Sequence, residues 1–188
     1  MHRDNLRKKL EKYKPNNSEE IASKKKMLNF LNNNENCFER ALSIGHFTGS
    51  CWIENHNGTK FLLTLHKKIG LWLQLGGHAD GDNNIARVAL REAYEESGLQ
   101  HIELLSEDIF DVGVHLIAAH RDVPAHYHYD VRFIMRAFDE NIKISDESDD
   151  LRWFTEPPTH ETNLGDGVVR MFRKWKRFKV IIENFLLR

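Results

Sequence analysis

The sequence predicts an α/β fold in which a mixed β-sheet is sandwiched between helices, with a helical N-terminal extension. Strand-like alternation and turn signals dominate the middle of the chain, whereas helical periodicity is confined to the two ends and one central segment. The chain has 188 residues, 40% of them hydrophobic, which is enough for one domain with a sizeable core. We therefore expect an extension over residues 1–43 and one domain over residues 44–188.

The extension is expected to contain two helical segments. Ser18 precedes two glutamates, and this pattern is typical of a helix start because a hydroxyl caps the first turn and acids favour the positive end of the helix dipole. This helix should run to about Asn32. The segment before Pro15 should form the other helical piece.

The first strands of the domain are expected at residues 46–55 and 59–68. An Asn-Gly pair at residues 57–58 lies between them and favours the tight turn of a β-hairpin. A short apolar run at residues 71–75 leads into a loop rich in glycine and aspartate at residues 76–84. Because glycine has no side chain, such a loop brings backbone groups close to a bound ligand.

A helix should follow this loop. Asp82, Asn83 and Asn84 are all suitable N-caps, and the apolar residues after them recur at helical spacing. Gly98 is well placed for the left-handed backbone conformation that ends many helices.

Two more strands are expected at residues 110–119 and 126–138, and a short edge strand or a turn at residues 149–154. From about Asp166 the pattern is that of an amphipathic helix. The strand at residues 126–138 alternates, so its residues divide between two faces. One face should carry Tyr127, Tyr129, Val131, Phe133 and Met135, and the other His126, His128, Asp130, Arg132 and Arg136.

Charge is unevenly distributed along the chain. The net charge is −1, but residues 44–167 contain 10 Lys and Arg against 21 Asp and Glu, which suits a metal site better than direct phosphate binding. No apolar run approaches the length of a membrane span, and the N-terminus lacks a secretory signal. Cys37 and Cys51 make no disulfide framework, so we expect a cytoplasmic protein with no membrane partner.

Three glutamates of the central helix are candidates for metal ligands. Glu92, Glu95 and Glu96 are spaced three and four residues apart and therefore project to one side of the helix. Arg91 lies four residues before Glu95 and is placed to pair with it. Carboxylate oxygens favour a hard cation, which makes Mg²⁺ the expected cofactor and Mn²⁺ a second candidate. A solvated helix face is the alternative interpretation of these charges.

The longer stretch GGHADGDNNIARVALREAYEESGL resembles the Nudix signature. That signature is a glycine, five residues, a glutamate, seven residues, then Arg-Glu-x-x-Glu-Glu-x-Gly and an apolar residue. The positions that agree with it are Gly77, Arg91, Glu92, Glu95, Glu96, Gly98 and Leu99. One position departs, because the first glutamate of the signature falls on Asn83, and Asp82 would replace it only if the loop were shifted by one residue.

The resemblance implies a Nudix-like fold and a metal-dependent pyrophosphohydrolase that cleaves the diphosphate linkage of a nucleoside diphosphate derivative. By position, Glu92, Glu95, Glu96 and the carbonyl group of Gly76 would bind the metal. Arg91 would orient the glutamates. The general base varies in this family, so Glu92 and two acids outside the helix, Glu147 and Asp150, remain candidates, of which we favour Glu147.

The polar face of residues 126–138 is a candidate for substrate binding. His78, Asp130 and Arg132 would line a cleft, with Arg132 on a phosphate group. A solvated or helix-covered polar face is the alternative. A zinc site made by the histidines of this region would need ligands from different strands.

Two other functions are compatible with the same fold. A Nudix-like binding module would recognise a nucleotide without cleaving it, but such a module has no need to retain the metal ligands. An isomerase acting on prenyl diphosphates would need a nucleophilic cysteine, and Cys51 is poorly placed for that role on a strand. The sequence does not identify the substrate. The candidates are nucleotides, nucleotide sugars, ADP-ribose, dinucleoside polyphosphates and RNA 5′ ends. A homodimer also stays open.

Overall fold

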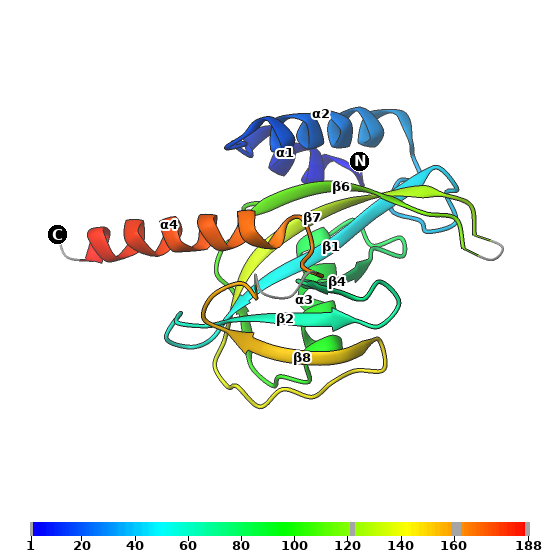
Figure 1. Cartoon of the computed structure of the whole chain (residues 1–188). Coiled ribbons are helices and arrows are strands. Elements are labelled where there is room, and N and C mark those ends of the chain that lie inside the picture. Colours follow the sequence, from blue (N-terminus) through cyan, green and yellow to red (C-terminus); the bar gives the residue numbers. More distant parts are fainter. Residues whose placement is uncertain (1, 121–122, 159–162, 187–188) are drawn as a thin grey trace.

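The computed structural model describes residues 2–120, 123–158 and 163–186, with side chains as far as residue 179. Figure 1 shows the arrangement of its helices and strands. The helices are α1 (Asp4–Lys12), α2 (Ser18–Asn33), α3 (Ile85–Ser97) and α4 (Val168–Leu186). The strands are β1 (Gly45–Glu54), β2 (Phe61–His66), β3 (Leu71–Leu73), β4 (Leu75–His78), β5 (Ile102–Leu104), β6 (Asp111–Ile117), β7 (His126–Ala137) and β8 (Ser148–Phe154).

The sheet is mixed, as predicted, and β1 and β7 form its centre. These two strands pair in parallel from Gly45 opposite Tyr127 to Glu54 opposite Arg136. The other pairings are antiparallel: β2 and β4 with β1, β5 and β6 with β7, and β3 and β8 with β2. The sequence left two possibilities for residues 149–154, an edge strand or a turn. The structure shows that they are part of strand β8. The parallel pairing brings together residues that are about eighty positions apart in the sequence.

Helices cover both faces of this sheet, which confirms the predicted sandwich (Figure 1). The larger core lies between the sheet and α1, α2 and α3, and it buries the odd-numbered residues of β7 from Tyr129 onward. The smaller core lies between the other face and α4, where Trp52, Phe61 and Trp175 pack together. The predicted alternation of β7 is thus confirmed by two cores on opposite sides.

The helix ends follow local side-chain chemistry. The N-cap of α2 is Asn17, whose side chain accepts a hydrogen bond from the amide of Glu20 at 2.9 Å, so the prediction that Ser18 is the cap was wrong by one residue. Of the three caps considered for α3, the structure uses Asn84, which accepts from the amide of Arg87. Gly98 ends α3 with φ of 66°, as predicted.

The extension packs onto the domain instead of projecting from it. Leu6, Leu10 and Met27 are buried in the larger core. Glu20 is fully buried and pairs with Lys174 of α4 at 2.9 Å. Within the described residues, no helix combines the length and the apolar character needed to cross a membrane.

Candidate functional site

Helix α3 lies very close to the sheet, and glycine allows this approach. Gly49 of β1 faces the helix, and a Cβ atom there would lie 2.8 Å from the carbonyl oxygen of Ile85. The apolar residues of α3 are buried against β1. Its glutamates are therefore directed to the edge of the helix that faces β4 and the loop after it.

Strand β4 pairs with β1 and also contacts α3, with no room for side chains at its glycines. Gly76 has φ of 155°, and a Cβ atom on it would collide with Ser50. A Cβ atom on Gly77 would collide with the carboxylate of Glu92. The two glycines thus bring the backbone of β4 directly beside the glutamates of α3.

The glutamates of α3 differ in environment. Glu96 is 6% exposed, and its Oε2 accepts a hydrogen bond from the amide of Gly76 at 2.8 Å. Glu92 is half-buried beside Gly77. The side chain of Glu95 is 62% exposed and faces solvent. The site therefore extends from a buried carboxylate to an accessible one.

Arg91 forms hydrogen bonds both to the loop backbone and to one of the glutamates. Its Nη2 atom donates to the carbonyl oxygen of His78 at 2.9 Å and to Oε1 of Glu92 at 2.8 Å. Its Nε atom lies 3.9 Å from Oε2 of Glu95. The predicted pairing with Glu95 is therefore present but long, and the closer partner is Glu92. Arg91 links the loop backbone to the glutamate row.

Negative charge gathers in this site without full compensation. Burial, together with the charges of Glu92, Glu147 and Glu95, raises the pKa of Glu96 to about 8, although the hydrogen bond from Gly76 opposes the effect. Burial also raises the pKa of Glu92, although Arg91 opposes the effect. The donors are all oxygen atoms, which is the ligand set that Mg²⁺ and Mn²⁺ prefer. A divalent cation fits these residues because it would relieve their mutual repulsion.

Glu147 lies in a loop before β8, near enough for its charge to act on the glutamates of α3. Its backbone carbonyl accepts from the amide of Lys67 at 2.9 Å, which ties the loop to the end of β2. Its carboxylate is exposed, and its charge raises the pKa values of both Glu92 and Glu96. Asp150 instead pairs with Arg152. Of the two acids considered outside the helix, Glu147 is the one whose charge acts on the glutamates.

Asp82 does not take the position of the missing signature glutamate. Its carboxylate accepts two hydrogen bonds from Arg87, both at 2.7 Å, and one from the amide of Asn84 at 2.8 Å. These contacts hold the start of α3. The suggestion that a shifted loop lets Asp82 support Arg91 is therefore corrected, because Asp82 is hydrogen-bonded to Arg87.

We expect Asp82→Asn to lower stability more than activity. The lost ion pair is partly exposed, so the free energy of unfolding should fall by about 0.5 kcal/mol, or about 1–2 °C in melting temperature for a chain of this size. Melting temperature and turnover should be measured for Asp82→Asn and for Asn83→Ala, which is the matched control. A much larger loss of turnover in Asp82→Asn than in Asn83→Ala, with both folded, would contradict this assignment.

The polar face of β7 is covered at Asp130 and Arg132, whereas His126 and His128 are only half-buried. Arg132 is 1% exposed and donates to Asp130 at 2.7 Å and to Asp111 at 2.8 Å, while its Nη2 atom lies 2.8 Å from Nε2 of His115. Arg170 of α4 also donates to Asp111. The predicted contact of Arg132 with a substrate phosphate is therefore corrected, because its guanidinium is buried in this network and the helix-covered alternative is observed.

Asp130 is also buried and belongs to the same network. It accepts hydrogen bonds from Ser50 at 2.7 Å, Thr48 at 3.0 Å and Gln74 at 3.2 Å. Its predicted contact with substrate is therefore replaced by a role in joining β7 to β1 and to Gln74, the residue between β3 and β4. His78 is different, since it is half-buried and directly follows the glycines beside Glu92.

One cation near the site was not found by sequence reasoning. Arg40, in the segment after α2, makes two hydrogen bonds of 2.6 Å to Asp80 in the loop. Its side chain is 59% exposed, and Asp80, Glu92 and Glu147 all raise its pKa. Nothing in the local sequence around Arg40 indicates this placement, because it depends on how the extension folds back onto the loop.

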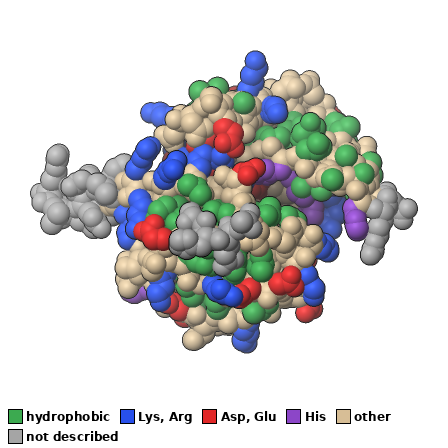
Figure 2. Space-filling view, viewed as in Figure 1, with side chains coloured by type: hydrophobic (Ala, Val, Ile, Leu, Met, Phe, Trp, Pro, Cys, Tyr) green, Lys and Arg blue, Asp and Glu red, His purple; other side chains and the backbone are tan. Residues whose placement is uncertain are grey.

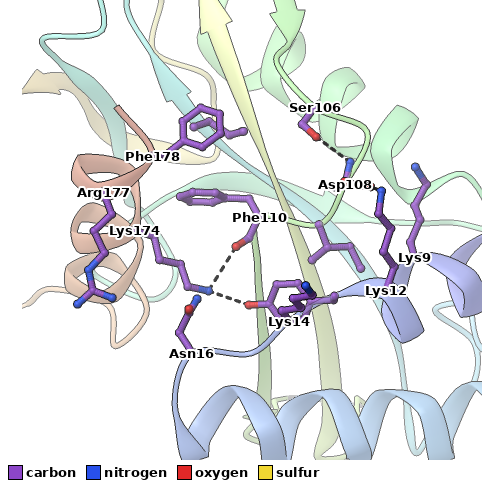
Figure 3. Close-up of a pocket in the computed structure, with 13 residues that line it drawn as sticks. Lys9, Lys12, Lys14, Asn16, Ser106, Asp108, Phe110, Lys174, Arg177 and Phe178 are labelled. Carbon is purple, nitrogen blue, oxygen red and sulfur yellow. Dashed lines mark hydrogen bonds and ion pairs between the residues drawn. The ribbon is translucent and has the colours of Figure 1, made fainter. Parts of the chain in front are cut away.

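A cavity of about 550 Å³ lies elsewhere, between α1, the segment at residues 106–110 and α4 (Figure 3). Basic residues line it, but two of them are paired with acids: Lys9 pairs with Glu107, and Lys12 pairs with Asp108. None of the glutamates of α3 lines this cavity. Lys174 is also paired, with Glu20 and Asp111, so ion pairs offset three of the five basic residues that line the cavity. The glutamate site remains the stronger candidate for chemistry.

Comparisons with known proteins agree with this geometry. A family model described as the NUDIX domain matches residues 46–170. A NUDIX-family hydrolase from Clostridium perfringens has a similar structure, with 24% identity, a TM-score of 0.53 and coverage of 71% of this chain and 97% of that one. No curated protein matches the chain.

Two further solved structures are similar at the level of the fold. A C. elegans Ap4A hydrolase has 16% identity and a TM-score of 0.54, with coverage of 71% of this chain and 97% of its own. A MutT protein from Methanosarcina mazei Go1 has 18% identity and a TM-score of 0.51, with coverage of 73% and 97%. Because the identities are low, these likenesses concern the fold alone.

Proposed function

This chain belongs to the Nudix family, and on that premise we propose that it is a metal-dependent pyrophosphohydrolase that cleaves the diphosphate linkage of a nucleoside diphosphate derivative. The observation that carries the proposal is the row of Glu92, Glu95 and Glu96 on α3, held by Arg91 beside the backbone of Gly76. A solvated helix face would not bury one of these carboxylates against a glycine amide.

The metal ligands in this proposal are Glu92, Glu95, Glu96 and the carbonyl oxygen of Gly76, with Mg²⁺ as the preferred ion and Mn²⁺ as a substitute. A bound divalent cation supplies charge neutralisation on the phosphate oxygens. Arg91 keeps the carboxylate of Glu92 turned toward the loop. These contacts preorganise the ligands, which reduces the cost of bringing their charges together.

Glu147 is the proposed general base. A water oxygen forms a bond to one phosphorus of the diphosphate, the bond from that phosphorus to the bridging oxygen breaks, and Glu147 takes the proton of the water. The support is electrostatic proximity, since the charge of Glu147 raises the pKa values of Glu92 and Glu96. Its exposed position also leaves room for water and substrate.

Arg40 is proposed to contact a phosphate group of the substrate in place of Arg132. It is a partly exposed guanidinium whose pKa is raised by Asp80 and by two acids of the site, Glu92 and Glu147. A planar guanidinium with several donors suits phosphate oxygens. His78 remains a proposed substrate-side residue because the charges of Arg40 and Glu147 both act on its pKa, which burial lowers.

We expect Arg40→Ala to raise KM about three- to tenfold while kcat changes little, because an exposed charged contact mainly affects binding. Arg87→Ala is the matched control, since Arg87 pairs with Asp82 of the same loop but not with the glutamates. Steady-state kinetics with any substrate that the enzyme cleaves would measure both. An unchanged KM in Arg40→Ala, or an equal rise in Arg87→Ala, would remove Arg40 from the substrate site.

A substrate panel tests the function directly. Nucleoside triphosphates, nucleotide sugars, ADP-ribose, dinucleoside polyphosphates and RNA with a 5′ triphosphate should be incubated with Mg²⁺ or Mn²⁺ and scored by the phosphate species released. Cleavage of at least one class, abolished by a chelator, is expected. Binding without cleavage would favour the nucleotide-binding module. The isomerase is disfavoured because Cys51 is fully buried and its thiol pKa is raised well above normal by that burial.

A further inference from the structure

Histidines from three strands meet on the α4 side of the sheet. His46 lies on β1, His78 on β4, and His126 and His128 on β7. His46 is directly opposite His128 in the parallel pairing, and His78 of β4 is opposite Thr48, two residues further along β1. Figure 2 shows histidine side chains gathered in a recess on the visible face of the molecule. The sequence alone separates these residues by as many as 82 positions.

The three imidazoles of His46, His78 and His128 form a nearly equilateral triangle. Their ring centroids are 5.0 Å apart for His46 and His78, 4.9 Å for His46 and His128, and 5.0 Å for His78 and His128. One nitrogen from each ring lies within 4.8 Å of the others. The middle of such a triangle is at most about 2.8 Å from each nitrogen, so shifts of under about 1 Å reach a Zn–N bond of about 2.1 Å.

A second observation points to a ligand in this triangle. His46 is 3% exposed, and neither of its ring nitrogens has a hydrogen-bond partner among the described residues. Buried polar atoms are nearly always paired, because an unpaired one loses its hydration without compensation. A cation bound between the three rings would give His46 the partner that the protein itself does not provide.

His126 lies beside this triangle, with its ring centroid 5.1 Å from those of His46 and His128. Its Nδ1 lies 2.9 Å from the carbonyl oxygen of Pro124, which can only accept, so Nδ1 carries the hydrogen and Nε2 has the lone pair that can accept or bind a metal. That Nε2 lies 3.2 Å from Nε2 of His128. Two nitrogen ligands of one tetrahedral zinc ion are about 3.3 Å apart, so this separation fits adjacent ligands.

The surroundings keep the rings uncharged. Burial lowers the pKa of His46 to about 4 and that of His128 to about 3, and neighbouring histidines add to the effect. Neutral imidazole is the form that binds metal. The charge of Arg40 near His46 is offset by Asp80, its hydrogen-bonded partner.

We propose that His46, His78 and His128 bind a transition-metal ion of borderline softness, with Zn²⁺ the expected occupant and the fourth position beside His126. Three imidazole nitrogens with no thiolate suit Zn²⁺, Co²⁺ or Ni²⁺ and do not suit Mg²⁺. This centre is separate from the carboxylate site of α3, and with zinc bound the imidazole of His78 is a metal ligand and no longer a substrate contact. His78 still links the two sites, because its carbonyl oxygen accepts a hydrogen bond from Arg91. The proposal does not rest on the hydrolase function.

The test is a Zn²⁺ titration of the metal-free full-length chain against a chromogenic chelator, with excess Mg²⁺ present to occupy the carboxylates. One tight equivalent of Zn²⁺ is expected. His46→Ala and His128→Ala should each weaken it at least about a hundredfold, the upper scale of losses seen for metal-site changes. His101→Ala, on an exposed histidine paired with Glu103, and Glu96→Gln should leave it unchanged.

X-ray absorption of the Zn²⁺-loaded wild-type chain keeps the test independent of how the variants fold. Scattering from at least three imidazoles with Zn–N distances of about 2.0–2.1 Å is expected. Zinc held mainly by oxygen atoms, or Zn²⁺ affinity that is lost in Glu96→Gln and kept in folded His46→Ala, would overturn the proposal. Failure of the hydrolase proposal would instead appear as absence of turnover in the substrate panel, with the zinc signature intact.

Discussion

Glu95→Gln and Glu96→Gln are each expected to lower turnover by about a hundredfold or more at saturating substrate. Each change keeps the size of the side chain and removes one negative ligand, so the charge on the phosphate oxygens is neutralised less well as the reaction proceeds. Glu95 is exposed, so its replacement should leave the melting temperature unchanged. Glu96 is buried and hydrogen-bonded to Gly76, and a glutamine can still accept that bond.

The measurement is the initial rate as a function of Mg²⁺ concentration for both variants. The concentration needed for half activity should rise, because a ligand has been removed. Glu103→Gln is a suitable control, since Glu103 is an exposed glutamate of β5 paired with His101. Turnover near the wild-type value in both variants at saturating Mg²⁺ would show that these carboxylates do not bind the catalytic metal.

Glu147→Gln is expected to lower turnover by roughly tenfold or more at saturating Mg²⁺, which is the lower end of what a general base contributes. The loss should fall on the chemical step, so the Mg²⁺ concentration for half activity should change little. This pattern distinguishes a base from a metal ligand. Rates and Mg²⁺ dependence should be measured together for this reason.

Asp150→Asn is the matched control for this prediction. Asp150 belongs to the same acidic segment, but its carboxylate pairs with Arg152 and accepts from the amide of Leu151. Its replacement should therefore have the smaller effect. If neither change matters while Glu92→Gln abolishes turnover, the base lies on α3 and the role given to Glu147 is wrong.

Features that depend on neighbouring residues were predictable from the sequence. The side of α3 that carries Glu92, Glu95 and Glu96 follows from the period of the helix, and Gly98 ended it as expected. The alternation of β7 assigned its two faces correctly for the same reason. The cap of α2 moved by one residue because Asn17 and Ser18 are both good caps and only the folded backbone chooses between them.

Features that depend on strand pairing and chain packing appear only in the tertiary structure. Arg132 was placed on the correct face, but Asp111, Asp130 and α4 bury it there, so its side chain serves the fold. Arg40 reaches the site because the segment after α2 packs on the loop at Asp80.

The sequence by itself therefore determined the family resemblance, the helix that carries the glutamates and the chemistry that their oxygens favour. Only the tertiary structure decided which polar residues are exposed and which histidines meet. The physical reason is the distance along the chain over which each effect acts. Helix period and strand alternation act over a few residues, while the parallel pairing of β1 with β7 joins His46 to His128 across 82 positions of the sequence.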